Sequence, residues 1–129
     1  MAKRPSGDTD TARELAIEFA RIARDDNSRD IAVLDLRSVS PVADYFVIAT
    51  GTSDRQLRAV CDELRDYGKR VGQRVWHVAG RDAADWIVLD FVDVVVHLFD
   101  EAHRRYYDLE LIWGAAPRVT WARWNQNRE

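Results

Sequence analysis

The sequence predicts one α/β domain in which helices flank a single-layer, mixed five-stranded sheet, in the order α β β α β β β α. Its 129 residues are the length of one domain. A composition of 47% hydrophobic and 10% aromatic residues is sufficient for a core without disulfides or a bound metal. Segments with helical spacing alternate with short apolar runs, a pattern typical of helices packed on a sheet.

The first part of the chain predicts a tail, a helix and two strands. Residues 1–9 are predicted to be a flexible tail. A helix then runs from Thr11 to about Arg24, and Thr11 with Glu14 fits a capping box. The runs 31–36 and 44–50 are predicted to be strands because they are short and mostly apolar, the second being rich in β-branched and aromatic residues.

The middle of the chain predicts a long helix and three strands. Ser53 and Gln56 form the S-x-x-Q capping box of this helix, and Gly72 ends it. Cys61 lies in its apolar stripe, which favours a small core residue over a reactive thiol. The segments 74–79, 85–91 and 93–99 follow as strands, and the last two are close enough in sequence to form a hairpin.

A last helix is capped by Asp100, has an apolar stripe that continues to Trp113, and stops at Gly114. The predicted domain therefore covers residues 10–114, and residues 115–129 are a C-terminal extension.

Side-chain alternation divides the predicted hairpin into two faces. One face is apolar and belongs under the helices: Ile87, Leu89, Phe91, Val94, Val96 and Leu98. The other face mixes apolar and polar side chains: Trp86, Val88, Asp90, Asp93, Val95 and His97. This second set is too polar for a dry core and too apolar for ordinary surface, so it predicts a protein-binding patch. The alternative is that a loop or the C-terminal tail covers Trp86.

The residue patterns of several enzyme classes are missing from the sequence. The turn 51–53 precedes a helix but has neither the second glycine nor the lysine of a phosphate-binding loop. Asp90 and Asp93 are three residues apart, not the two that would place both carboxylates on one strand face to hold metals. The three histidines do not have the spacing of zinc ligands. The residues alone therefore predict an interaction domain without catalysis, metal, cofactor or small-molecule substrate.

Net charge and targeting signals restrict the expected binding partners and the expected cellular compartment. With 19 basic and 22 acidic residues the formal net charge is −3, which argues against a general nucleic-acid binder. The N-terminus has no apolar stretch typical of a secretory signal, and no run is long enough to span a membrane. A single cysteine agrees with a reducing compartment. We therefore expect a cytoplasmic protein that does not enter membranes.

Four motifs in series resemble the family of ribosomal silencing factors, also known as Iojap proteins. They are the segment 44–53, the A-D-W strand 84–90, the segment 93–99, and Arg104 with residues 107–110 and Trp113. Together they cover about residues 11–113. Any one of these motifs is weak, but four in the family's order and spacing are highly specific.

The resemblance implies a fold similar to that of nucleotidyltransferases without a working catalytic site. It also implies binding to the large ribosomal subunit through ribosomal protein L-fourteen, which keeps the small subunit from joining and represses translation. Trp86 would belong to the contact surface. We further expect Asp90, Asp93 and Arg104 to orient the protein and steer it toward a charged partner. The alternatives are a nucleotide-binding module that uses the turn 51–53 and an RNA-binding module.

Two positions depart from the family pattern, and the extension adds a further question. Ala79 stands where the family usually has glutamate, and Val92 stands where it tends to have glycine in the hairpin turn. The extension carries Arg118, Trp121, Arg123 and Trp124, which could contact ribosomal RNA by charge and stacking; a disordered or self-packing tail is the alternative. An exposed apolar patch would also favour a homodimer of the free protein.

Overall fold

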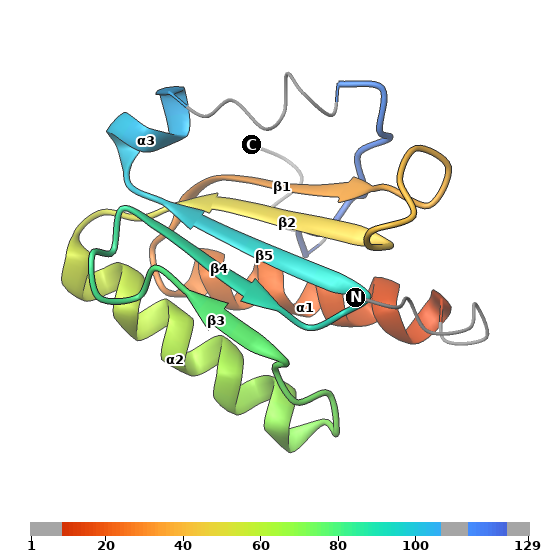
Figure 1. The fold of residues 1–129 in the computed structure, drawn as a ribbon, viewed down its shortest axis with the longest axis horizontal. Coiled ribbons are helices and arrows are strands. Elements are labelled where there is room, and N and C mark those ends of the chain that lie inside the picture. The colour runs from red at the N-terminus through yellow and green to blue at the C-terminus, as the bar shows by residue number, and fades with distance from the viewer. Residues whose placement is uncertain (1–8, 107–113, 124–129) are drawn as a thin grey trace.

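The computed structural model describes residues 9–106 and 114–123, and these form one mixed sheet with flanking helices (Figure 1). The elements are α1 (Thr9–Asp25), β1 (Arg29–Asp35), β2 (Tyr45–Thr50), α2 (Asp54–Arg70), β3 (His77–Ala79), β4 (Trp86–Asp90), β5 (Val94–Phe99) and α3 (Glu101–Tyr106). Their order confirms the predicted fold class. Most of the predicted tail, and the last helix beyond Tyr106, lie outside the described residues.

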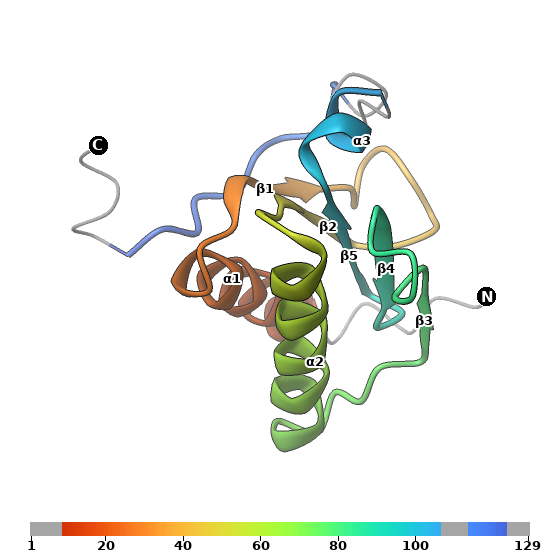
Figure 2. The same ribbon diagram turned by 90° about the vertical axis from the view of Figure 1, so that its left-hand side faces the viewer.

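The sheet has the strand order β1-β2-β5-β4-β3. Only β2 and β5 are parallel; the other neighbours are antiparallel, so the sheet is mixed. The predicted hairpin of β4 and β5 is confirmed, and its register runs from Trp86 opposite Phe99 to Asp90 opposite Val95. Helices α1 and α2 both lie on one side of the sheet (Figure 2). We call the face under these helices the inner face and the opposite one the outer face.

The inner face is the main core. The six hairpin residues predicted to lie under the helices are all buried in it, as are Phe19 of α1 and Cys61 of α2. Burial raises the pKa of the Cys61 thiol, which favours its neutral, unreactive form. Alternation along a strand is a local property, and here it is enough to sort residues between the two faces.

The helix ends test the predicted caps. Ser53 Oγ accepts a hydrogen bond from the Gln56 N–H at 3.1 Å, and Gln56 Oε1 accepts one from the Thr52 N–H at 3.1 Å, which confirms the cap of α2. Gly72 follows α2 with φ +77°, as predicted. The cap predicted for the first helix is wrong: α1 begins at Thr9, so Thr11 lies inside its first turn.

The described part of the extension packs along β1. The Asp35 N–H donates to the Pro117 carbonyl, and the Val119 N–H donates to the Val33 carbonyl, each at 2.8 Å. Val119 is buried in the main core. Residues 117–119 thus cover the β1 edge of the sheet, as the self-packing alternative predicted. None of the helices in the described residues is long and apolar enough to cross a membrane.

The turn between β4 and β5 forces Val92 into the left-handed region, with φ +77°. The Asp93 N–H donates to the Phe91 carbonyl across Val92 at 3.1 Å, and the Val92 N–H donates to Asp90 Oδ1 at 2.7 Å. A β-branched residue is strained in this conformation, and only glycine adopts it freely.

We therefore expect Val92→Gly to raise the free energy of unfolding by about 1 kcal/mol, because relief of strain outweighs the added freedom of the unfolded chain. Urea denaturation of the two proteins measures the difference. Val92→Ala removes the branch but keeps the strain, so it should gain less. A glycine variant less stable than the parent would show that Val92 is not strained.

Candidate docking face

The outer face gathers side chains from three adjacent strands. The register places Val88 opposite His97, and His97 opposite Ile48, so all three share this face. By the same register the face comprises Trp86, Val88 and Asp90 of β4, Val95, His97 and Phe99 of β5, and Phe46, Ile48 and Thr50 of β2. No described helix covers it as α1 and α2 cover the inner face (Figure 2).

Four rings form an aromatic cluster on the outer face: Phe46, Trp86, His97 and Phe99. The Trp86 and Phe99 rings are stacked with centroids 5.1 Å apart, and the His97 and Phe46 rings meet edge to face at 4.6 Å. Trp86 Nε1 donates a hydrogen bond to His97 Nδ1 at 3.1 Å. The indole is therefore held in one orientation by a stacked ring below it and by a hydrogen bond at its polar end.

His97 is the buried centre of this cluster, with 7% of its surface exposed. Burial lowers its pKa to about 4, so the imidazole is neutral at pH 7. Because Nδ1 accepts from Trp86, the ring proton is assigned to Nε2. Nε2 is buried, and no hydrogen-bond partner is found for it within the described residues. His97 was predicted to lie on the binding patch, but it is buried beneath the accessible side chains.

The predicted patch divides into accessible and buried residues. Trp86, Val88 and Asp90 are half-buried and retain surface that a partner could touch. His97 and Val95 were expected to be accessible on this patch, but both are buried. Val95 is only 6% exposed. They support the β4 side chains through packing within the sheet face.

Asp93 also differs from its predicted position. It is 4% exposed and precedes β5 in the hairpin turn, where its carbonyl accepts hydrogen bonds from the N–H groups of Asp44 and Tyr45. The predicted strand 93–99 included Asp93, because a polar residue next to an apolar run does not show where the strand begins. Its backbone joins the turn to β2.

Part of the outer face is covered by other segments of the chain. A second buried cluster unites Phe46, Val95 and Phe99 with Leu36 and Ala43 of the β1–β2 connection. Ala116 of the C-terminal segment joins the same cluster. Trp86 and Val88 pack at its margin. The exposed part of the face is therefore confined to the β4 side of the sheet.

The loop before β4 is anchored to α2, and this anchoring positions Trp86. Arg81 pairs with Asp62 through two hydrogen bonds of 2.9 and 2.7 Å. Arg58 donates to the carbonyls of Arg81 and Asp82. Gly80 is required in this loop because it has φ +82° and a Cβ there would lie 2.1 Å from the Trp86 carbonyl oxygen. The strand start at Trp86 is thus tied to the helical layer.

Arg104, which was expected to orient the protein on its partner, has a partner within the fold. Its guanidinium donates from Nη1 to Thr50 Oγ1 at the end of β2, at 2.9 Å. The half-buried side chain links α3 to the sheet. The predicted cap of α3 is confirmed, because the His103 N–H donates to Asp100 Oδ1 at 2.8 Å.

Sequence reasoning missed three aromatic residues near this face. Phe46 and Phe99 belong to it through strand register, which alternation within one hairpin does not reveal. Trp76 lies just before the edge strand β3 and is 64% exposed, the largest exposed fraction among the exposed large hydrophobic residues of the described chain. A signal for Trp76 was available, since it is a large aromatic residue within the predicted strand 74–79, of which only His77–Ala79 forms β3.

The nucleotide-binding alternative gains no support from the geometry. At the N-terminus of α2, the N–H groups of Thr52 and Gln56 are bonded to Gln56 Oε1 and Ser53 Oγ, so the chain itself occupies donors that a phosphate would need. Within residues 9–106 and 114–123, no three His, Cys, Asp or Glu side chains lie together as a metal would require.

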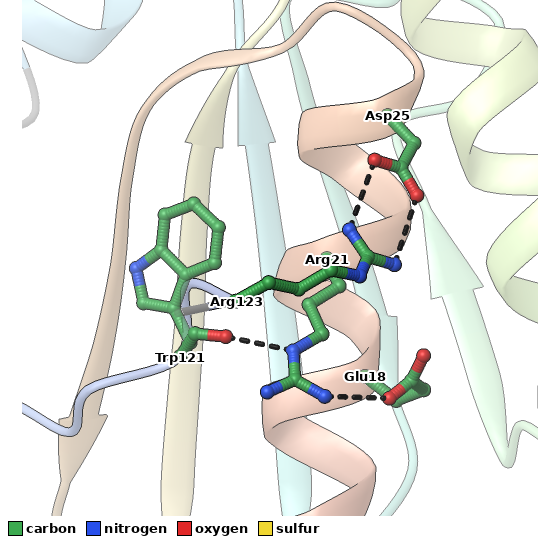
Figure 3. Close-up of polar contacts among 5 residues, drawn as sticks. All are labelled: Glu18, Arg21, Asp25, Trp121 and Arg123. Atoms are coloured by element: carbon green, nitrogen blue, oxygen red, sulfur yellow. Dashed lines mark hydrogen bonds and ion pairs between the residues drawn. The ribbon is translucent and has the colours of Figure 1, made fainter. Parts of the chain in front are cut away.

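The residues predicted to touch RNA are partly engaged by α1 (Figure 3). Arg21 donates to the Trp121 carbonyl at 2.8 Å and also reaches Glu18. Arg123 makes two hydrogen bonds of 3.1 Å to Asp25, so its charge is balanced. Arg118 is exposed, and Trp124 lies outside the described residues. An RNA contact by these residues remains a prediction.

Fold and site together define the class of protein: an α/β domain with one mixed sheet, helices on one side, and an aromatic, partly uncovered face on the other. The family model described as "Ribosomal silencing factor during starvation" matches residues 9–129. The chain belongs to this family.

Individual relatives agree with the family match. Ribosomal silencing factor RsfS of Bacillus subtilis is 43% identical over 102 residues, which are 78% of this chain and 86% of the relative. A chloroplastic Iojap protein of Arabidopsis thaliana is 34% identical over 91% of this chain and 50% of its own. The relative from Bacillus subtilis is named as a ribosomal silencing factor, a regulatory protein rather than an enzyme.

Solved structures share the fold. A crystal structure of a protein from Chromobacterium violaceum aligns with a TM-score of 0.74 and 31% identity, covering 88% of this chain and 92% of that one. A second, from Bacillus halodurans, aligns with a TM-score of 0.71 and 30% identity, covering 86% and 98%.

Proposed function

We propose that this protein docks on the large ribosomal subunit through ribosomal protein L-fourteen and so prevents association with the small subunit, which represses translation. Membership of the ribosomal silencing factor family carries this proposal. The β4 side of the outer face offers the contact surface: Trp86 as the aromatic anchor, Val88 beside it, and Asp90 at its rim. Such aromatic anchors commonly supply most of the energy of an interface. The protein would act in the cytoplasm.

The mechanism is steric and needs no chemistry. A domain of this length has a radius of gyration of roughly 14 Å, and so a body some 35 Å across. Joining of the subunits requires direct contacts between two closely opposed surfaces. A body of this size bound beside those contacts keeps them from forming. Repression would then follow from occupancy alone, in proportion to the bound fraction of large subunits.

Val88→Glu tests the docking surface with little disturbance of the fold. Val88 is half-buried on β4, so a carboxylate can reach water in the free protein but would be buried without a partner in the complex. We expect at least about a tenfold loss of binding, measured by co-sedimentation with purified large subunits. Light scattering should show that the variant no longer slows subunit joining.

Val71→Glu is the matched control, because Val71 is exposed at the end of α2, on the helical side of the sheet. It should bind as the parent protein does. Thermal melts of both variants show whether they are folded. Equal binding by folded Val88→Glu would contradict docking through this face, and binding without any effect on joining would contradict the steric mechanism.

A further inference from the structure

A groove of about 570 Å³ lies between helix α2 and the connection that leads from α2 to β3. Figure 1 shows this connection. One wall is a stripe of α2 whose members are spaced three and four positions apart, so they share one side of the helix. We call the site the α2 groove; its lining residues are Asp62, Arg65, Asp66 and Lys69 of α2 with Arg74 and Val75 of the connection.

The basic side chains of the α2 groove are not engaged by the fold. Within residues 9–106 and 114–123, the side chains of Arg65, Lys69 and Arg74 make no hydrogen bond or ion pair, and all three are exposed. Asp62 bonds instead to Arg81, which lowers its pKa, so this carboxylate is already balanced. Arg65 lowers the same pKa further, which indicates that its guanidinium faces the groove.

The surroundings of the α2 groove are basic although the chain is not. Residues 65–77 hold four of the 19 basic residues and one of the 22 acidic residues, Asp66. The net charge of −3 argues against a general nucleic-acid binder, but contact with a few phosphates depends on the local excess of positive charge. This segment provides such an excess.

An exposed aromatic ring adjoins these cations. Trp76 directly follows Val75 of the groove wall and is 64% exposed. Its ring meets that of His77 edge to face, with centroids 5.9 Å apart. Surfaces that bind single-stranded nucleic acid combine cations for the phosphates with aromatic rings on which bases stack. An acidic peptide would satisfy the cations but would offer no base to the indole, so the combination favours RNA over an acidic protein.

We propose that the α2 groove and Trp76 bind a single-stranded segment of RNA in the large ribosomal subunit. Arg65, Lys69 and Arg74 bind its phosphates, and an unstacked base stacks on Trp76. The segment is single-stranded because the bases of a duplex are stacked on one another. This inference rests on the proposed function for the source of the RNA. It adds a second contact beside the outer face, since β3 and β4 are neighbours in the sheet.

Binding to isolated RNA tests the α2 groove without the ribosome. The probe is a short, fluorescein-labelled, single-stranded RNA of mixed sequence that does not pair with itself, and fluorescence anisotropy at low salt measures its affinity. The parent protein should bind it. Trp76→Ala should raise the dissociation constant at least about tenfold, and Trp76→Phe should keep most of the affinity because a ring remains for stacking. Arg74→Ala should reduce the slope of log affinity against log salt by about 0.7, the value for one phosphate of a single strand.

Arg55→Ala is the matched control for Arg74→Ala. Arg55 is exposed at the other end of α2, so its loss changes the net charge equally but leaves the groove intact. This variant should bind RNA as the parent does. Circular dichroism shows whether each variant is folded. A parent that does not bind the RNA, equal losses in the two arginine variants, or unchanged RNA binding by Trp76→Ala would each overturn the proposal.

Large subunits separate this proposal from docking through the outer face. In co-sedimentation Trp76→Ala should weaken binding at least about threefold, whereas Val88→Glu should bind isolated RNA as the parent does. Loss of subunit binding in Val88→Glu alone would contradict the RNA contact, and loss in Trp76→Ala alone would contradict docking through the outer face. Val71→Glu remains a valid control, because Val71 lines a different groove, between α2 and α1.

Discussion

Replacing Trp86 with alanine should weaken binding to the large ribosomal subunit at least about thirtyfold and lower the free energy of unfolding by about 2 kcal/mol. Both effects are expected because the indole packs against the domain on one side and is accessible to a partner on the other. One side stacks on Phe99 and donates to His97, and the other remains accessible. Co-sedimentation and urea denaturation measure the two losses separately.

Trp86→Phe is the matched variant. It keeps a ring against Phe99 but removes the Nε1–H that His97 accepts, so it should lose only about 1 kcal/mol of stability. Binding should fall less than in the alanine variant because an aromatic surface remains. An alanine variant that binds large subunits as well as the parent protein would rule out Trp86 as the anchor. The sequence placed Trp86 on a face open to a partner, and its half-buried, hydrogen-bonded position shows that it also supports the fold.

Acidification should destabilise the protein through His97. Its pKa is about 4 in the folded state against an ordinary value of 6.5, so between these values the unfolded chain binds the proton and the folded chain does not. The contribution of His97 is therefore complete above pH 6.5 and is lost as the pH falls towards 4. The loss amounts to about 3 kcal/mol, because each unit of pKa difference is worth about 1.4 kcal/mol.

His97→Asn isolates this effect. The amide oxygen can replace Nδ1 as the acceptor for Trp86, and asparagine does not titrate. The variant should start from a lower stability at pH 7 but show a flatter decline to pH 4 in urea titrations. The pKa values of carboxyl groups such as Asp35 and Asp62 are lowered by Arg37 and Arg81. Their contributions to the pH dependence of stability are the same in both proteins and cancel in the comparison. Parallel curves would show that His97 is protonated in the folded state.

Local patterns predicted most of the fold. Alternation assigned Ile87 and Leu89 to the covered face, and the Ser53 cap and Gly72 stop bounded α2, because each depends on residues close in sequence. The start of α1 was predicted too late, because Thr9 and Asp10 favour a helix start as Thr11 does.

The candidate site was only partly predictable. Alternation identified the face that carries Trp86 and Val88, but it could not show that Phe46 of β2 completes the aromatic cluster or that Trp76 stands exposed beside β3. Those facts depend on which strands are neighbours. Strand order is set by contacts between residues far apart in the chain, and one sequence does not display them.

By itself the sequence determined the order of the elements and the inner face, since hydrogen bonds within turns and the two-residue period of a strand act over a few residues. Tertiary structure alone decided what lies over the outer face and along the edges. There, Leu36 and Ala116 cover part of the aromatic cluster, Val119 packs beside β1, and β3 has β4 as its one neighbour among the described strands. The burial of a side chain depends on all the segments that pack against it, including distant ones. The exposed fractions of His97 and Trp86 are therefore set by the tertiary structure and not by the neighbouring sequence.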